Sequence, residues 1–184
     1  HEGAYLGLQY REQTGPVQIE GRKLSGYAAV FNEVSHRTPF GPERIHPQAF
    51  SQDPFDNVVA LYNHDKNIVL GSVRSGTLKV WTDQKGLRYE IDPLPETRAD
   101  VREAISRRDV WGSSFGFLPR LDQVKWEKVP PHGDIATIMR AQVLDLGPVL
   151  RPAYSGTTAE VRQFNARAEA LKLRYPPGYL ERGA

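Results

Sequence analysis

The central stretch of the chain, residues 58–91, reads VVALYNHDKNIVLGSVRSGTLKVWTDQKGLRYEI. Short apolar runs alternate in it with turn-forming residues, of which Ser75-Gly76 and Gln84-Lys85-Gly86 are the clearest. This spacing is typical of antiparallel strands joined by tight turns. It predicts a meander of four strands, over residues 58–62, 68–73, 77–82 and 87–91.

Further strands are predicted on both sides of this meander. Gly26–Phe31 is a compact apolar run that suits a buried strand, and Val110–Leu118 predicts another. Gln123–Val129 and Ala136–Leu146 predict a hairpin around a Pro- and Gly-rich turn. Together these segments predict a mainly β fold with helices (α+β), a closed antiparallel barrel of about seven strands ringed by a few helices. The same pattern also allows a sandwich.

Two longer helices and one short one are predicted. Thr97–Arg108 has Val101 and Ile105 on one face, with Thr97 as a capping residue. Thr157–Leu173 predicts a second helix, and a short helix is expected after Pro47. The polar residues 1–18 suggest a loosely attached lead-in, residues 19–173 one folded domain, and residues 174–184 a flexible tail.

Composition excludes several kinds of site. The 184 residues include no cysteine, which rules out disulfides, thiolate zinc sites and cysteine catalysis. The formal net charge of +2 is too small to indicate nucleic acid as a partner. No apolar run approaches the roughly 18 residues of a membrane span. Histidines and acids show no metal-ligand spacing, and no glycine-rich phosphate loop occurs, so we expect neither a metal nor another cofactor.

A serine and a histidine stand out as a candidate catalytic pair, because serine becomes a nucleophile when a base removes its proton. His64 follows an apolar strand, a position that fixes the backbone and can project the side chain into a cleft. Ser114 lies between Gly112 and Gly116, which would let a substrate approach and leave amide groups free for an oxyanion. Tight strand packing would explain these glycines equally well. Ser113 stays open as the alternative, since strand alternation points it to the other face.

A carboxylate could complete this pair by orienting the imidazole. Asp145 lies in the apolar run Leu144–Val149, where an unpaired acid would be costly. Its partner could be His64, Arg151 or backbone amides. Asp65 is the rival acid, although neighbours in a strand usually point apart.

Five segments, in order, resemble parts of the tailed-phage (caudovirus) prohead maturation protease family. They are residues 26–32, 45–50, 61–71, 114–117 and 144–154, and the likeness extends over residues 24–162. Two features depart from the family pattern. Gly147 stands where the family often has Ser, and Gly112-Ser113 replaces a pair that usually has a larger residue before the nucleophile.

The resemblance implies a fold similar to that of the herpesvirus assemblins, a closed β-barrel ringed by helices. It implies that His64 is the base, Ser114 the nucleophile and Asp145 the third catalytic residue. Residues 19–173 would then be the protease domain. The implied activity is serine endopeptidase cleavage of scaffold and major capsid protein segments, and of the chain itself, inside the immature procapsid in the host cytoplasm. The assemblin analogy implies a homodimer.

Two other functions stay open at this point. The chain could be a non-enzymatic β-barrel scaffold or shell-binding module derived from such a protease. It could also be an esterase-like hydrolase that shares the Ser/His pair.

Overall fold

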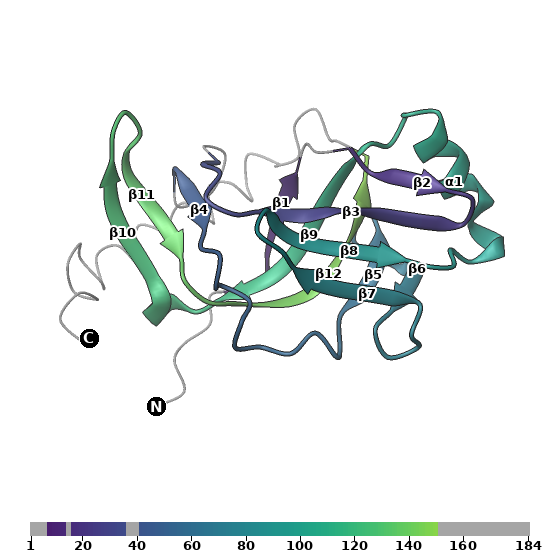
Figure 1. The fold of residues 1–184 in the computed structure, drawn as a ribbon, viewed down its shortest axis with the longest axis horizontal. Helices are drawn as coiled ribbons and strands as arrows, with labels where there is room; N and C mark the ends of the chain where they lie inside the picture. The colour runs from purple at the N-terminus through teal and green to yellow at the C-terminus, as the bar shows by residue number, and fades with distance from the viewer. Residues whose placement is uncertain (1–6, 14–15, 36–40, 151–184) are drawn as a thin grey trace.

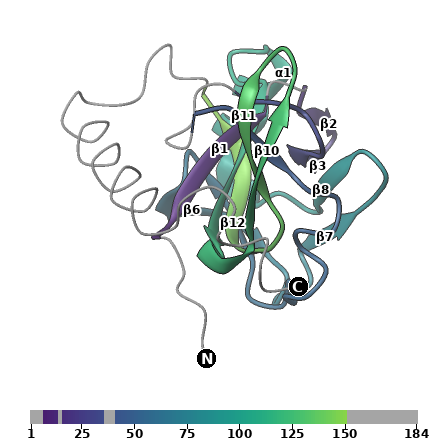
Figure 2. The same cartoon turned by 90° about the vertical axis from the view of Figure 1, so that its left-hand side faces the viewer.

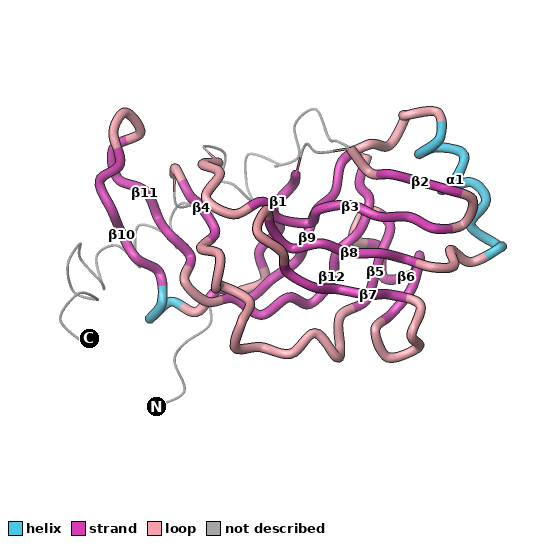
Figure 3. The backbone as a smooth tube through the Cα atoms, in the orientation of Figure 1, coloured by secondary structure: helices cyan, strands magenta, loops and turns pink. Residues whose placement is uncertain are grey.

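A computed structural model describes residues 7–13, 16–35 and 41–150. These residues form twelve strands, one α-helix and two short 3₁₀-helices (Figure 1, Figure 3). The strands make three sheets, with five, four and three members. No helix in the described ranges has the length and apolar character that crossing a membrane would require.

The five-stranded sheet carries the residues of greatest interest. Its order is β1 (Gln9–Gln13), β9 (Gly112–Pro119), β12 (Ala141–Val149), β5 (Val59–Tyr62) and β6 (Asp65–Ser72). Neighbouring strands are antiparallel, except that β12 runs parallel to β5. β9 and β12 therefore lie in the interior of the sheet.

The other two sheets are smaller. The four-stranded sheet has the order β2 (Gln18–Glu20), β3 (Lys23–Val30), β8 (Gly86–Ile91) and β7 (Leu78–Thr82). The three-stranded sheet has the order β10 (Val124–Val129), β11 (Gly133–Ile138) and β4 (Glu43–Ile45). The β10–β11 hairpin projects from one end of the molecule and lies nearest the viewer in Figure 2. Helix α1 (Ala99–Ser106) lies at the other end (Figure 1).

The prediction of a closed barrel is wrong, because all three sheets are open. The predicted meander is cut where β6 ends, and the chain turns through Gly76, which has φ +76°, into a different sheet. β5 pairs with β6 and β7 with β8, but β6 and β7 are in separate sheets. The predicted strand Ala136–Leu146 is likewise divided into β11 and β12. The first break leaves β6 and β7 as edge strands where a barrel would continue pairing.

One apolar core joins the five-stranded and four-stranded sheets. It includes Phe115 and Phe117 from β9, Leu87 and Tyr89 from β8, and further residues of β3 and β12. Phe115 and Phe117 stack with ring centroids 4.5 Å apart. These side chains lie on one face of β9, so the alternate residues of that strand face the other way.

The helices agree only in part with the prediction. α1 spans Ala99–Ser106 after a 3₁₀-helix, η1 (Glu96–Arg98), and buries Val101 and Ile105 as expected. Thr97 is not the cap of α1, because the residue before that helix is Arg98, which makes no side-chain capping bond. A second 3₁₀-helix, η2 (Leu121–Gln123), precedes β10. The expected helix after Pro47 is a turn instead. The predicted helix 157–173 and the tail 174–184 lie outside the described residues.

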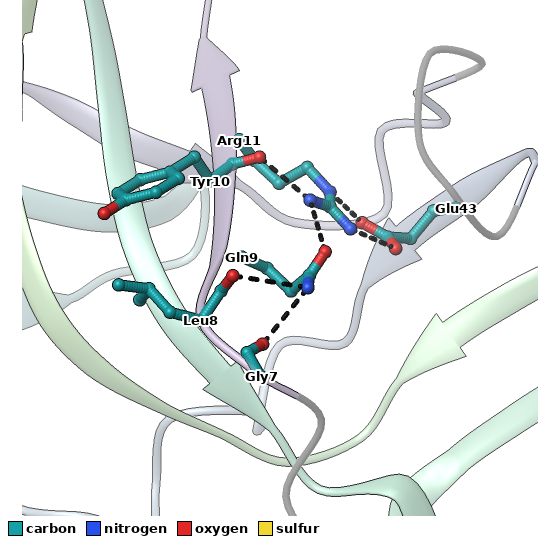
Figure 4. A network of polar contacts seen from close by, with 6 residues as sticks. All are labelled: Gly7, Leu8, Gln9, Tyr10, Arg11 and Glu43. Atoms are coloured by element: carbon teal, nitrogen blue, oxygen red, sulfur yellow. Dashed lines mark hydrogen bonds and ion pairs between the residues drawn. The ribbon is translucent and has the colours of Figure 1, made fainter. Parts of the chain in front are cut away.

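Strand β1 arises from the segment that we expected to be a loosely attached lead-in. It pairs with β9 over residues 9–13, from Gln9↔Phe117 to Gln13↔Ser113. Arg11 donates from Nε and Nη2 to the two carboxylate oxygens of Glu43, at 2.7 and 2.9 Å (Figure 4). Glu43 lies in β4, so this pair fastens β1 to the three-stranded sheet as well.

Candidate active site

His64 occupies a two-residue hairpin turn. Asn63 and His64 have φ of 53° and 56°, and they connect Tyr62 to its paired residue Asp65. Positive φ at both central residues is the geometry of a type I′ turn, which fits the right-handed twist of a hairpin. Residues other than glycine populate this left-handed region sparsely, so both residues adopt it at a cost. His64 therefore depends on the surrounding contacts to hold it in place.

Asn63 ties this turn to the end of β12. Its backbone N–H donates to the Pro148 carbonyl at 3.1 Å. Its side-chain Oδ1 accepts a hydrogen bond of 2.7 Å from the backbone N–H of Leu150. Both the backbone and the side chain of Asn63 thus bond the turn that carries His64 to residues 148–150.

The two candidate serines point to opposite faces of β9. Ser113 Oγ lies 2.7 Å from the buried Tyr89 hydroxyl, between the two large sheets. A Cβ added at Gly26 would come within 3.0 Å of Ser113 Oγ, so the glycine makes room for this contact. Ser114 faces the other way, toward His64. The predicted alternation is therefore present in the strand.

Asp145 reaches the site from the next strand, β12. A register irregularity between Val143 and Asp145 leaves the acid opposite Gly116 of β9. A Cβ at Gly116 would lie 2.7 Å from Asp145 Oδ2, so only glycine leaves room for the carboxylate in this position. Gly147, at φ +154°, has a similar role, because a Cβ there would lie 2.1 Å from the Leu61 carbonyl oxygen of β5.

The structure brings the three predicted side chains into one chain of contacts. His64 Nδ1 lies 2.5 Å from Asp145 Oδ1, and His64 Nε2 lies 2.6 Å from Ser114 Oγ. The His64 and Asp145 side chains are 19% and 11% exposed, and Ser114 is 1% exposed. Ser114 is therefore buried beside His64.

Asp65, the rival acid, has its hydrogen-bonding partners away from the His64 ring. Asp65 Oδ1 accepts hydrogen bonds from the backbone N–H and the side-chain amide of Asn67, at 2.8 and 3.1 Å. Arg151, the other considered partner of Asp145, lies outside the described residues. Among the residues that the structure describes, no group of three or more His, Cys, Asp or Glu side chains could hold a metal ion.

Tyr10 is a site residue that the sequence did not reveal. Its ring lies 4.2 Å from the His64 ring, centroid to centroid, with the planes inclined at 53°. Burial raises the pKa of the Tyr10 hydroxyl, and the Asp145 carboxylate raises it further. The available signal was the alternation of Leu8 and Tyr10 with polar neighbours, which is typical of a strand.

The amides of β9 do not offer the expected oxyanion site near Gly116. β9 has a partner strand on each side over Ser113–Phe117, namely β1 and β12. Amides of an interior strand point along the sheet at these partners. Donors for an oxyanion would then come from near Gly112, which lies beyond the pairing with β1, or from another loop.

Comparison with known proteins agrees with the resemblance found in the sequence. The model of the caudovirus prohead serine protease family matches residues 8–171. The chain belongs to this family. A search of curated proteins found no match to this prohead protease, and neither did a search of solved structures.

Family membership supports a general role as a prohead serine protease. The matched residues of this prohead protease include β1 as well as His64, Ser114 and Asp145. The N-terminal strand is therefore part of what the chain shares with its family.

Proposed function

We propose that the chain is a serine endopeptidase in which Ser114 is the nucleophile, His64 the general base and Asp145 the group that orients the imidazole. The observation that carries the proposal is the continuous set of contacts from Asp145 Oδ1 through both ring nitrogens of His64 to Ser114 Oγ. Each contact is within hydrogen-bonding distance, so a proton can move from the hydroxyl to the ring without rearrangement of these three groups.

The direction of proton transfer follows from the partners of each nitrogen. A carboxylate can only accept, so Asp145 favours the tautomer with the proton on Nδ1. Nε2 is then an acceptor and takes the Ser114 proton as Oγ attacks the peptide carbonyl. The same nitrogen later gives that proton to the leaving amine, and water hydrolyses the acyl-enzyme. The nearby carboxylate stabilises the imidazolium that forms between these steps.

The substrates follow from the family rather than from the site. We propose that the chain cleaves segments of the scaffold and major capsid proteins inside the immature procapsid, in the host cytoplasm, and then cleaves itself. Self-cleavage after about residue 175 predicts a shortened C-terminus, and mass spectrometry that finds active material intact would contradict it. The proposed homodimer would appear as twice the chain mass in light scattering.

Co-expression with the cognate capsid protein tests the activity directly. Ser114→Ala should abolish capsid-protein processing, because no other hydroxyl in the described residues accompanies Ser114 at His64 Nε2. Ser113→Ala is the matched control, since it removes the same atom one residue away on the opposite face of β9. If wild type cleaves no capsid protein, and Ser114→Ala and His64→Ala both support capsid assembly as wild type does, the non-enzymatic scaffold is favoured instead. Hydrolysis of small esters with no cleavage of capsid protein would favour the esterase.

A further inference from the structure

The imidazole of His64 has hydrogen-bonding partners at both of its nitrogens, Asp145 and Ser114, but these do not hold the faces of the ring. The residue stands on a two-residue turn at positive φ, and turns are the parts of a hairpin that move most readily. Asp145 contacts the ring at Nδ1 and Ser114 contacts it at Nε2, and two contacts in the plane of the ring leave it able to tilt about the line that joins them. A contact against the face of the ring would restrict that rotation.

Tyr10 makes such a contact. The two ring centroids are 4.2 Å apart, slightly closer than the roughly 4.5–7 Å typical of aromatic pairs, so the rings are in direct contact. Gly116 lies beneath this contact, because a Cβ added there would come within 3.0 Å of Tyr10 Cε1. The same glycine makes room for Asp145, so one position accommodates two neighbours of His64.

β1 holds Tyr10 rigidly although it is an edge strand. Arg11 Nη1 donates to the Tyr10 backbone carbonyl at 2.8 Å, while the rest of the guanidinium binds Glu43 (Figure 4). Glu43 is 2% exposed and the Arg11 side chain 10%, so water weakens this pair little. Arg11 also lies over the Phe117 ring, 5.3 Å from its centroid. Figure 4 shows the Tyr10 ring on the opposite side of the strand from this network.

We propose that Tyr10 is a positioning residue for the reaction. Strand β1, held by the Arg11–Glu43 ion pair, keeps the Tyr10 ring against His64. This inference rests on the proposed function of His64 and Ser114. The ring rather than the hydroxyl carries the role. The raised pKa of Tyr10 keeps the phenol neutral through the range in which a histidine base works, so the hydroxyl adds no charge there.

The test compares three variants of the full chain with wild type. Tyr10→Ala removes the ring, Tyr10→Phe keeps it, and Leu8→Ala is the matched control. Leu8 is two residues before Tyr10, immediately ahead of β1, and is similarly exposed, at 40% against 45% for Tyr10. Capsid-protein cleavage gives kcat and KM. The rate of covalent labelling by a fluorophosphonate, which reacts with activated serines, reports on Ser114 without any substrate contact.

Tyr10→Ala should lower kcat and the labelling rate by about tenfold or more while KM changes by less than about twofold. Tyr10→Phe should restore both rates, and Leu8→Ala should leave them unchanged. Equal rates for Tyr10→Ala and wild type, or loss of activity in Leu8→Ala equal to that in Tyr10→Ala, would overturn the inference alone. If wild type labels no faster than Ser114→Ala, the proposed function fails, and this inference fails with it.

Discussion

Replacement of Gly116 with alanine links the packing of β9 to the chemistry at His64. The new Cβ would lie 2.7 Å from Asp145 Oδ2, whereas ordinary contact begins at 3.4 Å, so the carboxylate must retreat by about 0.7 Å. If it moves as a unit, its 2.5 Å contact with His64 Nδ1 lengthens to about 3.2 Å, the limit of a useful hydrogen bond. A displacement of 1 Å in a catalytic group can cost about 100-fold in rate, so we expect a loss of about 10- to 100-fold.

The fold should survive this substitution. Alanine is favoured over glycine within a strand by about 0.5–1 kcal/mol, which offsets part of the strain of about 1–3 kcal/mol from the added methyl group. Thermal unfolding should therefore change by only a few degrees, while fluorophosphonate labelling of Ser114 slows markedly. Gly7→Ala is the control, since a Cβ at Gly7 would meet no atom within 4 Å.

A double variant separates the route through Asp145 from a general disturbance of the strand. In an Asp145→Ala background the methyl group at Gly116 has no carboxylate to displace. The Gly116→Ala change should then cost much less than it does alone, which is the non-additivity expected of residues in contact. Full labelling activity in the single variant, or the same loss in both backgrounds, would refute the reasoning.

Three further predictions concern the acid, the second serine and the effect of pH. Asp145→Asn should lower the labelling rate by about 10³-fold with little change in melting temperature, because an amide no longer fixes the proton on Nδ1; a fall below tenfold would argue against the orienting role. Ser113→Ala should keep labelling but lower the free energy of unfolding by about 1–3 kcal/mol, since it removes the partner of the buried Tyr89 hydroxyl. The Arg44 hydrogen bond lowers the pKa of Glu127 to about 2 from its ordinary 4.5, so Glu127 stabilises the fold above pH 4.5 and loses this contribution as pH falls toward 2. Because solvent screens this partly exposed ion pair, we expect it to contribute about 1 kcal/mol to the free energy of unfolding. In urea unfolding, Glu127→Gln should be less stable than wild type by this amount at pH 7, and the two should converge in acid.

The sequence predicted the local elements around the site well. An apolar run indicates a buried strand whatever the place of that strand in the fold. The predicted strands Val58–Tyr62 and Val110–Leu118 therefore correspond closely to β5 and β9. The i, i+4 pair Val101 and Ile105 predicted the helix for the same reason. His64, Ser114 and Asp145 were singled out from their places at the end or in the middle of such strands, and the structure brings them together.

The pairing of strands could not be predicted in the same way. Nothing in the local pattern of residues 68–82 distinguishes a hairpin from a change of sheet, and the closed barrel failed at that point. β1 was missed because an edge strand of five residues, with polar side chains on one face, resembles a loop. Its buried pair, Arg11 and Glu43, is 32 residues apart in sequence, and neither charge alone indicates a partner. Tyr10 was missed together with the strand that carries it.

The glycines near Ser114 illustrate how a motif can be found correctly and interpreted incompletely. Gly116 suggested either an opening for substrate and oxyanion or a close packing site. In the structure β9 has neighbours on both sides, and the space above Gly116 contains the Asp145 carboxylate and the Tyr10 ring. Gly147, which lies opposite Ser114, likewise lets β12 approach the Leu61 carbonyl of β5. At Gly116 the missing side chain is what allows two neighbours of His64 to reach it, so the steric role of glycine is itself part of the site.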